Sequence, residues 1–153
     1  MKIGKQLALP VLILVAGGFV TIACEGDKPA DNATAGQPRV FFVEPKDGAT
    51  VTSPLHMKFG SEGIQIAAVP PGELTKEQVR PGMAHYHVGI DQSCLADGQI
   101  IVKGTPSWVH FGDGKDVFDT QLTPGQHKLA LQLGDDLHAT LPGTWQEITV
   151  TVQ

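Results

Sequence analysis

Short runs of alternating apolar and polar residues, each closed by turn-forming residues, constrain the fold of this chain more than any other feature. Residues 127–133 place three leucines on one face of such a run, and residues 146–152 do the same with isoleucine and valine. Alternation with a period of two is typical of a half-buried β-strand. The 18 glycines and 11 prolines among 153 residues supply the many turns that short strands need. The pattern predicts an all-β fold, an antiparallel β-sandwich of about seven strands, with recognisable strands at 40–43, 55–59, 64–66, 85–91, 127–133 and 146–152.

The N-terminal segment has the pattern of an export signal. Lys2 and Lys5 precede an apolar run over residues 7–20, which is shorter than the ~20 apolar residues of a membrane-spanning helix. The sequence Val-Thr-Ile-Ala-Cys at 20–24 resembles a bacterial lipobox, with Thr21 at the position of the usual leucine. We therefore predict a lipoprotein-type signal peptide at 1–23 and lipidation of Cys24.

Residues 24–39 are polar and carry no hydrophobic periodicity, which is typical of a flexible linker. The remaining residues, 40–153, have the length of one domain. The sequence thus predicts a domain attached to a membrane through lipidated Cys24, on the periplasmic side of the cell envelope. Cleavage without lipidation, giving a soluble periplasmic protein, is the alternative.

Composition argues against other classes of function. The formal net charge is −5 and no basic stretch is present, so nucleic acid is not an expected partner. The chain has no Gly-x-Ser-x-Gly elbow and no serine in a recognisable triad context, so we predict no enzymatic activity. If Cys24 is acylated, Cys94 has no partner within the chain and remains a free or partner-linking thiol.

A histidine pair gives the main indication of chemistry. His85 and His87 flank Tyr86 on a predicted strand, so their side chains project from one face about 6.6 Å apart. Tyr86 and Val88 occupy the opposite face, which we assign to the core, and the histidines are then expected at the surface. Neutral imidazoles at this spacing suit zinc or copper.

Further ligands must come from elsewhere in the chain. His110 and His138 are the candidates, and Met83, predicted in a loop before the pair, is a weaker one. The alternative interpretation is that the histidines only form a hydrogen-bond network within a structural or protein-interaction module, whose protein partner the sequence does not identify.

Other polar residues have simpler interpretations. His127 shares a face with leucines and is expected to cap the core, whereas His56 alternates with core positions and is expected at the surface. Met57 is assigned to the core. The aspartates at 113, 116 and 119 surround two glycines without an EF-hand pattern, so an ordinary turn is favoured over calcium binding.

Ordered sequence blocks also indicate a family. Residues 44–54, Glu-Pro-Lys-Asp-Gly-Ala-Thr-Val-Thr-Ser-Pro, resemble the first strand, turn and strand of bacterial immunoglobulin-like domains. The blocks GMAHYHVGID at 82–91, HFGDG at 110–114, LTPGQHKL at 122–129 and GDDLH at 134–138 follow in order. Together they resemble the bacterial exported domains grouped as domain-of-unknown-function family 4399, over roughly residues 40–152.

The resemblance implies an immunoglobulin-like sandwich and a candidate histidine site, but no activity. Members typically carry three consecutive histidines, where this chain has Tyr86 in the middle position. Of a second member motif, His-Val-Pro-His, only His138 remains. Copper/zinc superoxide dismutases also carry a His-x-His strand in a β-sandwich, but their other ligand blocks and their disulfide are missing here.

Overall fold

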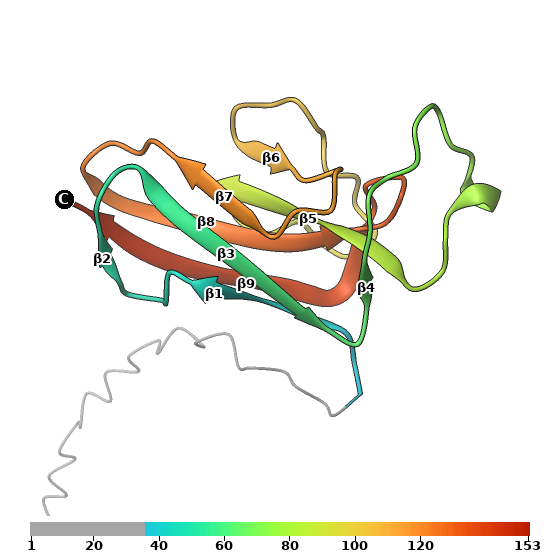
Figure 1. The fold of residues 1–153 in the computed structure, drawn as a ribbon, viewed down its shortest axis with the longest axis horizontal. Coiled ribbons are helices and arrows are strands. Elements are labelled where there is room, and N and C mark those ends of the chain that lie inside the picture. Colours follow the sequence, from blue (N-terminus) through green and yellow to red (C-terminus); the bar gives the residue numbers. More distant parts are fainter. Residues whose placement is uncertain (1–35) are drawn as a thin grey trace, which may run out of the picture.

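Two β-sheets packed face to face make up residues 36–153, the part of the chain that this computed structural model describes (Figure 1). The strands are β1 (Arg39–Glu44), β2 (Thr50–Val51), β3 (Leu55–Glu62), β4 (Gln65–Ile66), β5 (Met83–Ile90), β6 (Trp108–His110), β7 (Val117–Thr120), β8 (Gly125–Gly134) and β9 (Thr140–Val152). One 3-10 turn, η1 (Lys76–Gln78), lies between β4 and β5. Within this part of the chain no helix is long and apolar enough to cross a membrane. The predicted signal peptide, Cys24 and most of the predicted linker lie outside the described residues.

The strand order confirms the predicted immunoglobulin-like sandwich. One sheet has the order β1-β3-β7, and the other has the order β2-β9-β8-β5-β4 with β6 paired to β5. In chain order these correspond to strands A, B and E facing strands C, F and G of the immunoglobulin arrangement. The prediction was an antiparallel sandwich, and the long strands do pair in this way. Two pairings of short strands, β2 with β9 and β4 with β5, are parallel. The strands that the predicted ranges do not include are β2, β6 and β7, which have two to four residues and are too brief to show a clear alternating pattern.

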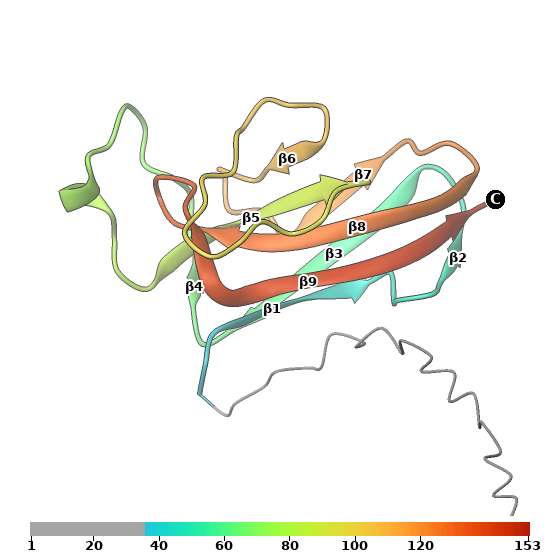
Figure 2. The same ribbon diagram turned by 180° about the vertical axis from the view of Figure 1, so that it is seen from behind.

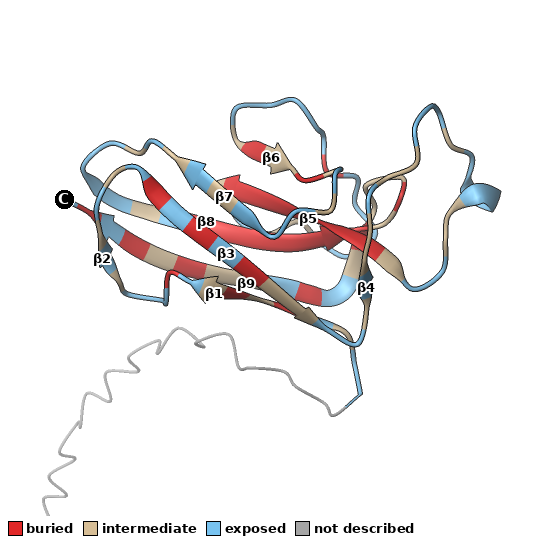
Figure 3. Ribbon diagram, in the orientation of Figure 1, coloured by how far each residue is buried: buried red, intermediate tan, exposed pale blue. Residues whose placement is uncertain are grey.

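The main core lies between the two sheets. The ring of Phe59 on β3 packs against Phe42, Tyr86 and Phe111, with ring centroids 5.3–5.9 Å apart. Met57 on the same strand is fully buried, as expected. Leu129, Leu131 and Leu133 of β8 are buried in the same cluster, on the face that their alternation predicts. Figure 3 shows alternating burial along β3, but continuous burial along β5 and most of β8.

A second, smaller core covers the outer face of the larger sheet. The segment 91–107 crosses this face (Figure 2), and Ile101 packs there with Ala130 and with Trp108 of β6, the short strand paired with β5. A Cβ on Gly89 would lie 3.1 Å from the Trp108 ring, so the indole rests almost on the β5 backbone. We call residues 91–110 the covering segment. It is the reason why β5 is buried on both faces.

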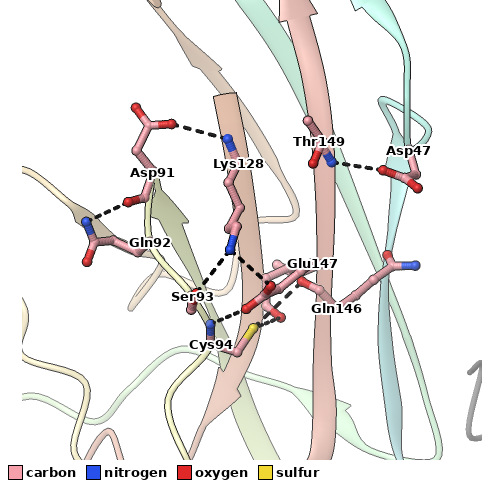
Figure 4. A network of polar contacts seen from close by, with 10 residues as sticks. Asp47, Asp91, Gln92, Ser93, Cys94, Lys128, Gln146, Glu147 and Thr149 are labelled. Carbon is pink, nitrogen blue, oxygen red and sulfur yellow. Dashed lines mark hydrogen bonds and ion pairs between the residues drawn. The ribbon is translucent and has the colours of Figure 1, made fainter. Parts of the chain in front are cut away.

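Polar contacts fix the start of the covering segment to the sheet (Figure 4). The Asp91 carboxylate accepts a hydrogen bond from the Lys128 backbone, and the Lys128 ammonium donates to the Ser93 hydroxyl, both at 3.2 Å. The Cys94 amide donates to a Glu147 carboxylate oxygen at 2.6 Å. Burial raises the pKa of the Cys94 thiol to about 12, so this cysteine is a protonated thiol at neutral pH.

Candidate metal centre

Four histidines from three separate segments meet on the outer side of the larger sheet, where the covering segment ends. His85 and His87 belong to β5, His110 is the last residue of β6, and His138 lies in the turn between β8 and β9. One ring nitrogen from each lies within 4.8 Å of the corresponding nitrogen of every other. The structure thus brings together all four histidines that the sequence suggests as ligands. Met83 is not in the expected loop but is the first residue of β5, and it is partly buried.

Strand register accounts for the meeting of three of these segments. Antiparallel pairing of β5 with β6 places His87 opposite His110. Pairing of β5 with β8 places His85 opposite Gly134, the last residue before the turn that carries His138. Since neighbouring strands lie ~4.8 Å apart, side chains on one face at these positions are within reach of one another.

The turn that carries His138 is held by its own polar groups. The Asp135 carboxylate accepts hydrogen bonds from the backbone amides of Leu137 and Ala139, at 2.8 and 2.9 Å. His138 itself has a left-handed backbone with φ of 68°, and its amide donates to the Asp135 carbonyl. The His138 carbonyl accepts a hydrogen bond from Ile101, which ties the turn to the covering segment.

An ion pair between partly exposed Arg80 and the buried carboxylate of Asp136 also holds this turn. The Asp136 side chain is only 3% exposed, and its carboxylate accepts two hydrogen bonds from the Arg80 guanidinium, at 2.7 and 2.9 Å. The hydrogen bonds from Arg80 lower the pKa of Asp136, so the carboxylate is ionised at neutral pH. Arg80 belongs to the loop before β5, and the pair therefore links that loop to the His138 turn.

Two glycines make room for the histidine rings. A Cβ on Gly134 would lie 2.7 Å from Cε1 of His87 and 3.3 Å from Cα of His138. A Cβ on Gly112 would collide with the His110 ring and lie 2.9 Å from its Nε2. Any side chain larger than hydrogen at these positions would displace a ring. The sequence interpretation missed both glycines, Asp135 and the Arg80–Asp136 pair, because their roles depend on contacts across the sheet.

The two β5 histidines are buried and lack hydrogen-bond partners. His85 is 1% exposed and His87 is fully buried, whereas His110 and His138 are partly buried. Among the described residues, neither ring nitrogen of His85 or His87 has a hydrogen-bond partner. His110 and His138 share one contact, with their Nε2 atoms 3.0 Å apart. The prediction that His85 and His87 face the surface is therefore wrong, because the covering segment lies over that face.

All four imidazoles are in the neutral form that binds metals. Burial, together with the neighbouring histidines, lowers the pKa of His85 to about 3 and that of His87 to about 2. The pKa values of His110 and His138 are also lowered, first by burial and then by neighbouring charge. A neutral imidazole has a free lone pair, which is the state needed for coordination.

The donor set and its spacing fit a transition metal. Zn–N bonds of 2.0–2.1 Å place the nitrogens of a tetrahedral site about 3.3 Å apart. The His110–His138 pair is near that separation already, and the remaining nitrogens need only small ring movements from within 4.8 Å. The four histidines could thus hold one zinc or copper ion. By contrast, Asp113 forms an ion pair with Lys115 at 2.7 Å and accepts the Lys115 amide, which is the ordinary turn that the sequence favours.

Comparison with known families places the histidines in a family context. Residues 57–153 match the family described as domain of unknown function (DUF4399). The chain belongs to this family. The matched part of the DUF4399 domain begins later than the predicted residue 40, but it includes all four clustered histidines. Comparison with curated proteins and with solved structures gave no match.

Proposed function

We propose that this chain is an exported module that binds one zinc or copper ion through His85, His87, His110 and His138. The observation that carries the proposal is the meeting of four neutral imidazoles, two of them buried without hydrogen-bond partners among the described residues. Burying a polar group without a partner costs roughly 1–3 kcal/mol. A cation bound by one nitrogen of each ring would offset part of that cost.

The alternative, a structural hydrogen-bond network, receives less support from the same contacts. Such a network would satisfy the buried rings of His85 and His87 first, because these are the most costly to leave without partners. In the described structure the only hydrogen bond within the group joins the two partly exposed rings, His110 and His138.

Export and lipid anchoring complete the proposal and rest on the sequence. The charged N-terminus, the short apolar run and the lipobox-like residues before Cys24 support it. A linker over residues 24–39 would give a flexible reach of about 20 Å between the anchor and the domain. The metal site would then lie outside the cytoplasm, close to a membrane surface.

Calorimetric titration of the full chain, purified without a histidine tag, tests metal binding. We expect one Zn(II) or Cu(II) ion per chain, and loss of that binding in a His85→Ala/His87→Ala variant. His56→Ala is the matched control, because His56 is exposed and pairs with Asp119 instead of joining the cluster. His138→Ala, which removes a partly exposed ligand, serves if the double variant does not fold. Equally weak binding by the parent chain and both cluster variants would remove the metal-binding proposal.

Mass spectrometry of the chain recovered from a bacterial envelope tests the anchor. We expect a mature N-terminal Cys24 carrying acyl chains, and release into the soluble periplasmic fraction on Cys24→Ser substitution. A mature chain that starts at another residue and is soluble without detergent would contradict lipidation. The metal-binding proposal would be unaffected by that result.

A further inference from the structure

The four histidine rings are arranged as a tetrahedron. Their six pairwise centroid separations are 4.4, 4.7, 4.8, 5.1, 5.2 and 5.6 Å. A square-planar set of donors would have two diagonals roughly 1.4 times as long as its sides. Here even the longest separation, 5.6 Å, is less than 1.4 times the shortest, 4.4 Å, so the rings are not arranged as a square. The ring of His85 is also nearly perpendicular to those of His110 and His138, at 89° and 82°, as in a three-dimensional cage.

The donor set narrows the choice of ion further. All members of the group are neutral imidazoles, and neither a carboxylate nor a thiolate belongs to it. Cu(II) favours tetragonal geometry and Cu(I) favours sulfur ligands, whereas Zn(II) accepts nitrogen donors in a tetrahedron. Cys94, the only cysteine among the described residues, is protonated and contacts backbone carbonyls of β8 and β9 through its sulfur.

We infer that the site is a closed, four-coordinate zinc site that serves as a cross-link between segments of the sandwich. This inference rests on the proposed metal binding and specifies its ion and its role. Four protein ligands complete the coordination of Zn(II), whereas catalytic zinc sites keep one position for water. The site therefore holds the fold together and does not activate water.

The positions of the ligands show what the ion would join. His85 and His87 lie on β5, inside the larger sheet, and His110 lies on the paired edge strand β6, where the covering segment ends. His138 lies in the β8–β9 turn, and its backbone carbonyl already accepts a hydrogen bond from the Ile101 amide of the covering segment. Pairing of β6 with β5 already holds the C-terminal end of the covering segment, and one ion bound to all four residues would add a second link there and extend it to the β8–β9 turn. The contacts of Asp91, Ser93 and Cys94 fasten the other end.

Cobalt substitution of the full chain tests the coordination. Tetrahedral Co(II) has intense visible d–d bands, and we expect these bands in the parent chain and in the His56→Ala control. Azide should leave the spectrum unchanged, because no coordination position is open. In His138→Ala three ligands remain, so we expect azide to shift the Co(II) spectrum. We also expect the Zn(II) affinity to fall by more than roughly 100-fold, which exceeds the usual loss when only a residue that contacts a ligand is removed.

Hydrogen exchange of the full chain, with and without one equivalent of Zn(II), tests the cross-linking role. We expect Zn(II) to slow amide exchange in residues 96–110, with little change in β1 and β3, which lie in the other sheet.

The parent chain with Cu(II) should give an electron paramagnetic resonance spectrum of distorted tetrahedral copper.

Each failure has a distinct meaning. If no ion binds, the proposed function fails together with this inference. Three results would show that the module binds metal but that the closed zinc site is wrong. These are weak visible bands of the Co(II) form, a change of the parent Co(II) spectrum on addition of azide, or a tetragonal Cu(II) spectrum. If Zn(II) binds tetrahedrally without slowing exchange in the covering segment, the cross-linking role is overturned.

Discussion

The two ends of the β8–β9 hairpin carry histidines in opposite environments. At the open end, Nδ1 of His127 lies 3.0 Å from an Asp91 carboxylate oxygen, and Nε2 lies 2.9 Å from the Thr123 carbonyl. At the turn end, His138 meets the buried histidines of β5, whose ring nitrogens have no partner among the described residues. The pKa of His127 is raised, first by the Thr123 carbonyl, whereas the pKa values in the cluster are lowered.

The difference shows which histidines the protein alone can satisfy. His127 has both nitrogens hydrogen-bonded and a carboxylate that stabilises its protonated form, so it is complete as a structural residue. His85 and His87 have lowered pKa values and no hydrogen-bond partner among the described residues, so the protein part described here leaves their lone pairs unused. Buried polar groups without partners are rare in proteins and call for a functional explanation.

The largest expected effect is a loss of stability of the metal-free cluster in acid. Below pH 6.5 the unfolded chain protonates His85 and His87, whereas the folded chain, with pKa values of about 3 and 2, does not. The free energy of unfolding therefore falls by about 1.4 kcal/mol per pH unit for each histidine as the pH drops below 6.5. Because this slope is reached only well below pH 6.5, the pair should lose about 3 kcal/mol between pH 6.5 and 5. Urea unfolding in the presence of a chelator measures this loss.

A His85→Leu/His87→Leu variant is the comparison for the acid effect. Carboxylates also titrate in this range, but they are common to both proteins. The variant should therefore show a flatter dependence of unfolding free energy on pH than the parent chain. Parallel pH dependences in the two proteins would show that the buried histidines are not held neutral.

The sequence predicted one face of β5 correctly and the other incorrectly. Alternation placed Tyr86 and Val88 in the core, where both are buried. It could not show that the other face is also covered, because the covering segment consists of loops and the short β6. A signal was present in Gly89, Ala130 and Gly134, three small residues on that outer face, since small residues allow another segment to approach closely. The same limit applies to His138, whose position depends on the β5–β8 register and on the Asp135 turn.

The next largest effect is expected at Gly134, the residue that makes room for the cluster. The methyl group introduced by Gly134→Ala would lie 2.7 Å from the buried His87 ring, so this substitution should cost about 1–3 kcal/mol of unfolding free energy. Zn(II) affinity should fall as well, because the ring is displaced. Gly112→Ala is the matched variant, and its effects should be smaller, because the His110 ring is partly exposed and can move. The reverse order, measured by urea unfolding and calorimetry, would contradict the assigned packing.

A single His87→Leu substitution separates stability from metal binding. Leucine removes two buried nitrogens without partners, so the metal-free chain should gain about 1–2 kcal/mol of stability. Stabilisation by Zn(II), seen in the parent chain as a higher unfolding midpoint, should be lost. Unfolding in chelator and in Zn(II) measures both quantities. Loss of stability in both conditions would indicate that His87 serves packing alone.

The smallest expected effect lies at the open end of the hairpin and has the opposite sign. The raised pKa of His127 means that its contribution to stability is fully present below pH 6.5 and is lost as the pH rises through its folded-state pKa. His127→Gln should therefore destabilise the chain at pH 6, by no more than about 1 kcal/mol because the partner Asp91 is exposed, and less at pH 9. Its affinity for Zn(II) should equal that of the parent chain. Two results for His127→Gln would contradict this contrast: a destabilisation that grows with pH, or a loss of Zn(II) binding. Either would show that His127 behaves as part of the cluster and that the two ends of the hairpin are not independent.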